Sequence, residues 1–78
     1  MSDSLYDHRY AELRAFLRST RLAAGLTQMQ IADVLGVKQS HVSKLERGEN
    51  FVDVLMYARW CRACNVAPGP FLEALRLP

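Results

Sequence analysis

Four polar residues stand close together in the middle of the chain, and their side chains can form directional hydrogen bonds. They are Lys38, Gln39, Ser40 and Lys44. The Gln39 amide has the geometry to bond adenine N6 and N7 together, and the Lys44 amine could reach guanine O6 or N7. Ser40 can donate or accept beside Gln39, and Lys38 could reach a base or a phosphate. This chemistry fits the base edges of a DNA major groove; the simpler alternative is that these side chains are only solvated.

Two apolar residues would hold this polar set outward. Val42 and Leu45 are three positions apart within residues 39–47. A helix over this stretch buries both on one side and turns the polar side chains towards solvent. We therefore expect residues 39–47 to form a recognition helix.

A second short helix is expected just before it, over residues 28–35. Its apolar residues at helical spacing are Ile31, Ala32 and Leu35. Thr27 is a good N-cap, and Gln30 stands three residues later as its capping-box partner. Gly36 can take the left-handed conformation that ends a helix in a sharp bend. Residues 27–47 are therefore predicted to form a helix-turn-helix.

The same stretch resembles a known family. The pattern TQ-x-x-IA-x-x-LGV-x-x-x-x-VSKLERG is similar to the lambda-repressor-like helix-turn-helix family, of the Xre or Cro/repressor type. The match is dense over residues 21–48 and looser to about Leu75. The resemblance implies a sequence-specific, double-stranded DNA-binding transcriptional regulator, a repressor, that uses no cofactor. It also implies that helix 39–47 enters the major groove and that a homodimer binds a palindromic operator.

The domain organisation is expected to be simple. Residues 1–8 would be a flexible N-terminus or an early turn of the first helix, with Ser4 or Asp7 as a possible cap. Residues 9–78 would form the DNA-binding domain.

Three further helices would complete a compact five-helix, all-α fold. A first amphipathic helix is expected to end at Gly25. Asp53 can cap a fourth helix, and a fifth is expected over residues 70–77.

Contacts with DNA phosphates should come from residues that flank the recognition helix. The candidates are Thr27, Gln28, His41, Arg47 and Asn50. Gln28 is the strongest, because it opens a helix whose free N–H groups and positive dipole end favour an anion. The resemblance implies a phosphate contact at this position too. Such contacts fix the orientation of the protein without reading the sequence.

Arg21 and Glu46 receive a structural role from the resemblance. In the family, the matching pair forms a partly buried salt bridge between the first and third helices. A bidentate bridge would fix the tilt of the recognition helix. The alternative is that the two are unrelated surface charges.

Cys61 and Cys64 form a CxxC pair. Redox pairs of this type usually belong to an α/β fold, and the chain has no strand pattern. Zinc would need further ligands, for which only the distant His8 and His41 remain. The spacing places both thiols on one side of a helix, so two buried, apolar thiols are the favoured interpretation, and no metal is expected.

The composition fits one small domain. The chain has 78 residues and a net charge of +2. No apolar run approaches the roughly 20 residues of a membrane span, and no secretion signal is evident, so we expect a cytoplasmic protein without membrane contact. No Ser/His/Asp set, carboxylate pair or glycine-rich phosphate loop is present. We therefore expect neither an enzyme nor a small-molecule ligand.

The last two helices carry more apolar residues than a short helix pair can easily cover. We expect part of this surface to form a homodimer interface, which would offset the small core. The interface candidates are Trp60, Phe71, Leu72 and Leu75. A competing interpretation is a protein-interaction module, such as an antitoxin or a subunit of a larger assembly. Such a module would more often expose hydrophobic residues on helix 39–47, where this chain is polar.

Overall fold

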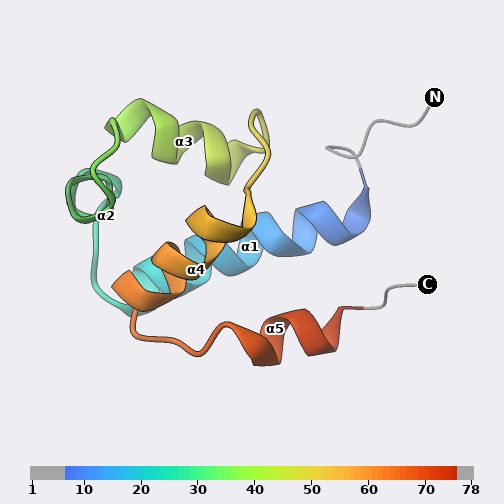
Figure 1. Ribbon diagram of the computed structural model, residues 1–78. Helices are drawn as coiled ribbons and strands as arrows, with labels where there is room; N and C mark the ends of the chain where they lie inside the picture. Colours follow the sequence, from blue (N-terminus) through green and yellow to red (C-terminus); the bar gives the residue numbers. More distant parts are fainter. Residues whose placement is uncertain (1–6, 76–78) are drawn as a thin grey trace.

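The computed structural model describes residues 7–75, which form five helices and no strand (Figure 1). The helices are α1 (His8–Ala23), α2 (Gln28–Leu35), α3 (Gln39–Arg47), α4 (Val54–Ala63) and α5 (Gly69–Ala74). The predicted all-α, five-helix fold is confirmed, and α2 and α3 have the predicted bounds. Residues 1–6, which belong to the predicted N-terminal segment, lie outside the described residues.

Side-chain caps determine where three of these helices begin. Asp7 Oδ1 accepts from a backbone N–H two residues later at the start of α1, at 2.8 Å, and Asp53 Oδ1 accepts from one three residues later at the start of α4, also at 2.8 Å. α2 begins with the predicted capping box. The Gln30 N–H donates to the Thr27 hydroxyl at 3.0 Å, and the Thr27 N–H donates to Gln30 Oε1 at 2.9 Å. Each bond satisfies an amide that lacks a partner inside its helix.

Two glycines turn the chain on either side of α3. Gly36 (φ 71°) ends α2 and Gly48 (φ 81°) ends α3, both in the left-handed region that a β-carbon disfavours. A β-carbon on Gly36 would meet nothing within 4 Å, whereas one on Gly48 would lie 2.6 Å from Arg14 Cδ. The Arg14 side chain is flexible and can shift, so the turn at Gly48 requires glycine chiefly for its backbone conformation.

The core lies where α1, α2, α3 and α4 meet, with α1 beside α4 (Figure 1). Its buried members are Leu17, Ile31, Ala32, Leu35, Val42, Leu45, Met56, Trp60 and Cys64. Trp60 is fully buried, and its indole N–H donates to the carbonyl oxygen of Leu17 at 3.0 Å and to the hydroxyl of Thr20 at 3.2 Å. The prediction that Trp60 lies at a dimer interface is wrong, because α4 turns this side chain inward against α1.

α5 packs on the rest of the molecule through aromatic rings. Phe71 stacks on Phe16 of α1 with the ring centroids 4.4 Å apart. The Tyr57 hydroxyl of α4 donates to the carbonyl oxygen of Pro68 at 2.5 Å, which fixes the turn that leads into α5.

α5 is shorter than predicted. It runs from Gly69 to Ala74, and Leu75 is extended, with φ −67° and ψ 135°. The helix expected over residues 70–77 is therefore too long at Leu75, and the last two positions of that range lie outside the described residues. Within residues 7–75, no helix is long and apolar enough to cross a membrane.

Candidate nucleic-acid interface

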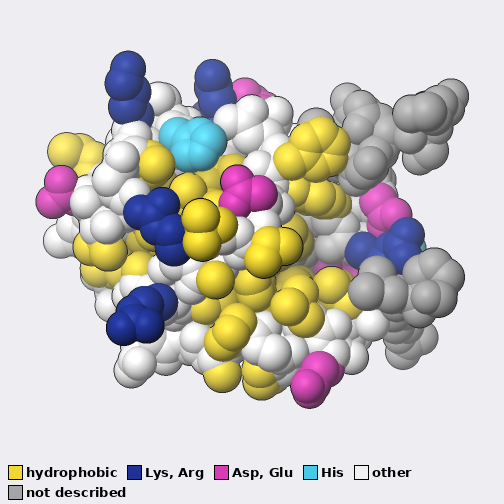
Figure 2. All heavy atoms as spheres, in the orientation of Figure 1, with side chains coloured by type: hydrophobic (Ala, Val, Ile, Leu, Met, Phe, Trp, Pro, Cys, Tyr) yellow, Lys and Arg dark blue, Asp and Glu magenta, His cyan; other side chains and the backbone are white. Residues whose placement is uncertain are grey.

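α3 has a buried side and a polar side. Val42 and Leu45 are almost completely buried in the core. The four side chains predicted to read bases are all exposed: Lys38, Gln39, Ser40 and Lys44. Basic side chains project into solvent at the end of the molecule that α3 occupies (Figure 2). The packing of α3 therefore leaves its polar side accessible to a duplex.

The recognition glutamine is held by a second glutamine. Gln39 Nε2 donates to Gln28 Oε1 at 2.8 Å, and Gln28 Nε2 donates to Glu46 Oε1 at 3.0 Å. A carboxylate can only accept, so the NH₂ group of Gln28 must face Glu46 and its oxygen must face Gln39. Gln39 therefore keeps its carbonyl oxygen and one N–H for a base, which is the pair that adenine N6 and N7 require.

This amide contact was not predicted from the sequence. The signal for it was two glutamines that open consecutive helices, at positions 28 and 39. The contact joins Gln28, the strongest predicted phosphate contact, to Gln39, the leading predicted base contact.

The far end of this chain of hydrogen bonds is a buried ion pair. Arg21 Nε lies 2.6 Å from Glu46 Oε2, and Arg21 Nη2 donates to Glu46 Oε1 at 3.0 Å. The two side chains are only 8% and 4% exposed. Arg21 Nη1 also donates to the carbonyl oxygen of Leu26 at 2.9 Å. The salt bridge that the resemblance implied is present, and its bidentate geometry ties α3 to the end of α1.

The start of α2 keeps donors available for an anion. The Thr27 hydroxyl oxygen accepts from Gln30, which leaves the hydroxyl hydrogen free to donate outward. The Gln28 amide uses its oxygen and one N–H in the bonds to Gln39 and Glu46, which leaves its second N–H. Both side chains therefore retain one donor at the positive end of a helix dipole.

A shallow hollow of about 320 Å³ lies beside α3. Its lining residues are Val37, Lys38, Ser40, His41, Lys44 and Asn50. The loop after α3 returns Asn50 to the helix, so that Asn50 Nδ2 lies 3.5 Å from His41 Nδ1. The predicted phosphate contacts His41 and Asn50 thus lie in one positively charged recess with both predicted base-reading lysines, Lys38 and Lys44.

Arg47 is already paired within the chain. Its Nε donates to Glu49 Oε2 at 2.7 Å, and its Nη1 donates to the hydroxyl of Ser43 at 2.6 Å. The hydrogen bond lowers the pKa of Glu49 and raises the pKa of Arg47. Because this pair is more than half exposed, a phosphate could replace Glu49 as the partner of Arg47.

Cys61 and Cys64 are free thiols and both are buried. Burial raises the pKa of each thiol, because the thiolate would lose solvation. Within residues 7–75, no group of three or more His, Cys, Asp and Glu side chains is placed to hold a metal ion.

One apolar surface was missed at the sequence level. Phe51, Val54 and Leu55 surround the cap of α4 and are each more than half exposed, with Val54 at 85%. The signal was the run FVDVL, in which apolar residues lie on both sides of the helix cap Asp53. Figure 2 shows hydrophobic side chains gathered on the molecular face in front of α4 and α5.

Two short helices joined at a left-handed glycine, with the second helix polar and exposed, define a helix-turn-helix DNA-binding domain. The family model for the helix-turn-helix domain matches residues 12–75. The structure is also similar to that of an XRE-family-like protein from Pseudomonas syringae pv. tomato strain DC3000, with a TM-score of 0.81 and 37% sequence identity over 90% of this chain and 85% of the other. Among curated proteins, no match was found.

The chain therefore belongs to the lambda-repressor-like, XRE-type helix-turn-helix family. The family predicted from the sequence is confirmed, and with it the general assignment as a DNA-binding regulator.

Proposed function

We propose that this protein is a sequence-specific transcriptional repressor, which binds as a dimer to a palindromic operator with α3 in the major groove. The observation that carries the proposal is the exposed amide of Gln39, which is braced through Gln28 to a buried ion pair. A braced side chain loses less conformational freedom when it binds a base than a free one does. An interaction module would gain little from such an arrangement.

Base reading is assigned to the exposed side of α3. Gln39 would bond an adenine, Ser40 would donate or accept beside it, and Lys44 would reach a guanine one turn later. Lys38 stands before the first turn, where it could contact either a base or a phosphate. Each good bidentate contact would discriminate against the wrong base by about 1–3 kcal/mol.

Phosphate binding is assigned to two places on either side of α3. The donors left on Thr27 and Gln28 lie at the N-terminus of α2, and His41 and Asn50 line the recess beside α3. Contacts on both sides would hold the helix in the groove at a fixed depth. Arg47 would join them by exchanging its partner Glu49 for a phosphate.

Dimerisation is assigned to the surface around α5. Of the residues predicted for this interface, Leu72 remains 48% exposed, and Phe71 and Leu75 are half-buried. The exposed residues Phe51 and Val54 add to the apolar area available to a second copy. A two-fold dimer would present two copies of α3 about one helical turn of DNA apart, and a bound dimer would exclude polymerase from a promoter. The proposed action places the protein in the cytoplasm, with the DNA.

The proposal is tested by selecting bound sites from random duplex DNA at two salt concentrations, because affinity depends strongly on salt. We expect a two-fold symmetric site. Gln39→Ala should lose discrimination at one base pair of each half-site, whereas Arg62→Ala, an exposed basic residue on α4 beside Val34, should bind as the natural protein does. Selection of no consensus, or equal effects of the two substitutions, would contradict sequence-specific reading by α3.

A further inference from the structure

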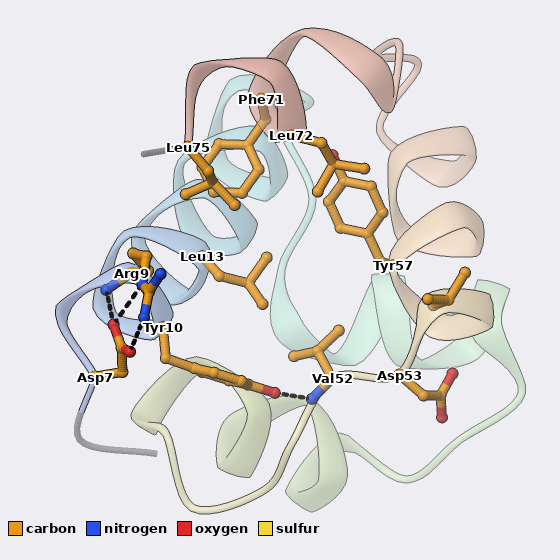
Figure 3. Close-up of a pocket in the computed structure, with 11 residues that line it drawn as sticks. Asp7, Arg9, Tyr10, Leu13, Val52, Asp53, Tyr57, Phe71, Leu72 and Leu75 are labelled. Atoms are coloured by element: carbon orange, nitrogen blue, oxygen red, sulfur yellow. Dashed lines mark hydrogen bonds and ion pairs between the residues drawn. The ribbon is translucent and has the colours of Figure 1, made fainter. Parts of the chain in front are cut away.

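An apolar hollow of about 310 Å³ lies between α1, the loop before α4, and α5 (Figure 3). Its walls include Tyr10 and Leu13 from α1, Val52 from the loop, and Phe71 and Leu72 from α5. Figure 3 shows these side chains directed towards a common centre from different elements. The space is at the lower end of the range for ligand pockets, about 300–1,000 Å³, so a molecule with one or two rings would fit.

Most polar groups around the hollow are already paired. The Tyr10 hydroxyl accepts from the backbone N–H of Val52 and keeps its hydrogen as a donor, and the Tyr57 hydroxyl donates to a backbone carbonyl outside the hollow. At the rim, Arg9 Nη2 lies 2.6 Å from Asp7 Oδ2 and Arg9 Nε donates to Asp7 Oδ1 at 3.0 Å. The inner surface therefore consists mainly of ring faces and aliphatic groups.

This pairing determines the charge of a suitable ligand. A charged molecule would lose hydration without gaining a free counter-charge, because Asp7 and Arg9 satisfy each other and the Asp53 carboxylate points away from the hollow (Figure 3). Water inside would find few hydrogen-bond partners on these walls, so an apolar molecule that displaces it gains free energy.

Contacts between aromatic rings position two of the side chains that line the hollow. Phe71 is stacked on Phe16, and the Tyr10 ring meets Phe51 edge-on with the centroids 5.6 Å apart. These ring contacts hold the walls apart in a defined shape, so the hollow is preformed.

We propose that this hollow is a binding site for a neutral, compact, hydrophobic molecule with one or two rings. None of the proposed base and phosphate contacts lines the site. The site shares Val54, Phe71, Leu72 and Leu75 with the surface proposed for dimerisation, so a bound molecule and a second copy of the chain would compete for it. A bound molecule would contact α1, the loop that follows α3, and α5 at once, and would stabilise the folded protein by mass action.

The test is a titration of the full chain with indole, followed by ¹³C–¹H methyl spectra and by the temperature of unfolding. We expect saturable shifts of the Leu13 and Val52 methyl signals and a higher unfolding temperature at saturation. Indole-3-carboxylate and tryptamine, the anionic and cationic relatives, should bind at least about tenfold more weakly because each would bury an unpaired charge.

A matched pair of substitutions on α1 locates the site. Leu13→Phe adds volume inside the hollow and should weaken indole binding about tenfold or more, whereas Leu22→Phe, at a position 55% exposed and outside the hollow, should leave it unchanged. If Leu13→Phe fails to fold, Val52→Phe serves with Val34→Phe as its exposed control.

Three results would overturn the proposal. The first is the absence of saturable binding up to the solubility limit of indole. The second is equal binding by the hollow-filling and control variants. The third is a set of methyl shifts that appears without indole as the protein concentration rises and that indole does not reverse, which would mean that a second copy of the chain, and not a small molecule, occupies the hollow.

Discussion

Replacing Arg21 with alanine would leave the Glu46 carboxylate buried without its cation. The Glu46 side chain is only 4% exposed, and it would keep a single hydrogen bond, from Gln28. Removing one partner of a buried ion pair costs about 3–5 kcal/mol. At about 0.05–0.15 kcal/mol per residue, a chain of 78 residues has a free energy of unfolding of roughly 4–12 kcal/mol. Arg21→Ala should therefore remove a large part of the stability of the whole domain.

An exposed pair in the same protein provides the control. Arg47 and Glu49 are nearly as close as Arg21 and Glu46, at 2.7 Å compared with 2.6 Å, but their side chains are 56% and 51% exposed. Arg47→Ala should cost no more than about 1 kcal/mol. The double substitution Arg21→Met with Glu46→Leu should recover most of the loss, since it leaves no charge buried.

Urea denaturation followed by far-ultraviolet circular dichroism would measure the free energy of unfolding of the natural protein, the two single variants and the double variant. The protein concentration must be equal throughout, because dimerisation would make stability depend on it. The reasoning fails if Arg21→Ala is no more destabilising than Arg47→Ala, or if the double variant is as unstable as the single one.

Four other outcomes are expected. Gly36→Ala and Gly48→Ala should each destabilise the fold by roughly 1–2 kcal/mol in the same denaturation assay, since both positions require a positive φ. The flexible Arg14 side chain should shift away from the new β-carbon at position 48, so a much larger loss at that position would contradict this. Hydrogen bonds from Arg9 lower the pKa of Asp7. The stability that the Asp7 carboxylate contributes is therefore present above its ordinary pKa of 3.8 and is lost as the pH falls below that value. Unfolding temperatures measured against pH should show this loss, and Asp7→Asn should reduce the dependence of the unfolding temperature on pH in that range. The two buried thiols at the end of α4 should react with iodoacetamide slowly in the folded protein and quickly in denaturant; fast labelling of the folded protein would argue against their burial. Leu72→Arg should weaken self-association in sedimentation experiments while leaving the circular dichroism spectrum unchanged; an unaltered dimer would exclude this side chain from the interface.

The sequence predicted the helix-turn-helix well because its signals are local. The capping box of Thr27 and Gln30 and the left-handed Gly36 act on neighbouring backbone groups, and they define the bounds of α2 without reference to the rest of the fold. The exposed polar side of α3 follows in the same way from the spacing of Val42 and Leu45.

The features that the sequence did not predict depend on the packing of distant elements. Apolar spacing indicates that Trp60 is buried on one side of a helix, but it does not distinguish α1 from a second chain as the surface that covers it. The apolar hollow joins Tyr10 to Val52 and Phe71, residues that only the tertiary structure brings together. The predicted C-terminal end of α5 lay too far along the sequence, because no capping residue or glycine marks where the helix ends.

The one-way direction of the hydrogen bonds from Gln39 to Glu46 limits how this domain could be retargeted to other operators. A new side chain at position 39 would lose its support unless it also offered a donor to Gln28. Replacing Gln28 with glutamate would put two carboxylates in contact and would remove the donor that joins position 28 to Glu46. Useful changes of specificity should therefore arise as coordinated substitutions at positions 28 and 39, and a library that varies both should yield functional proteins that single replacements miss.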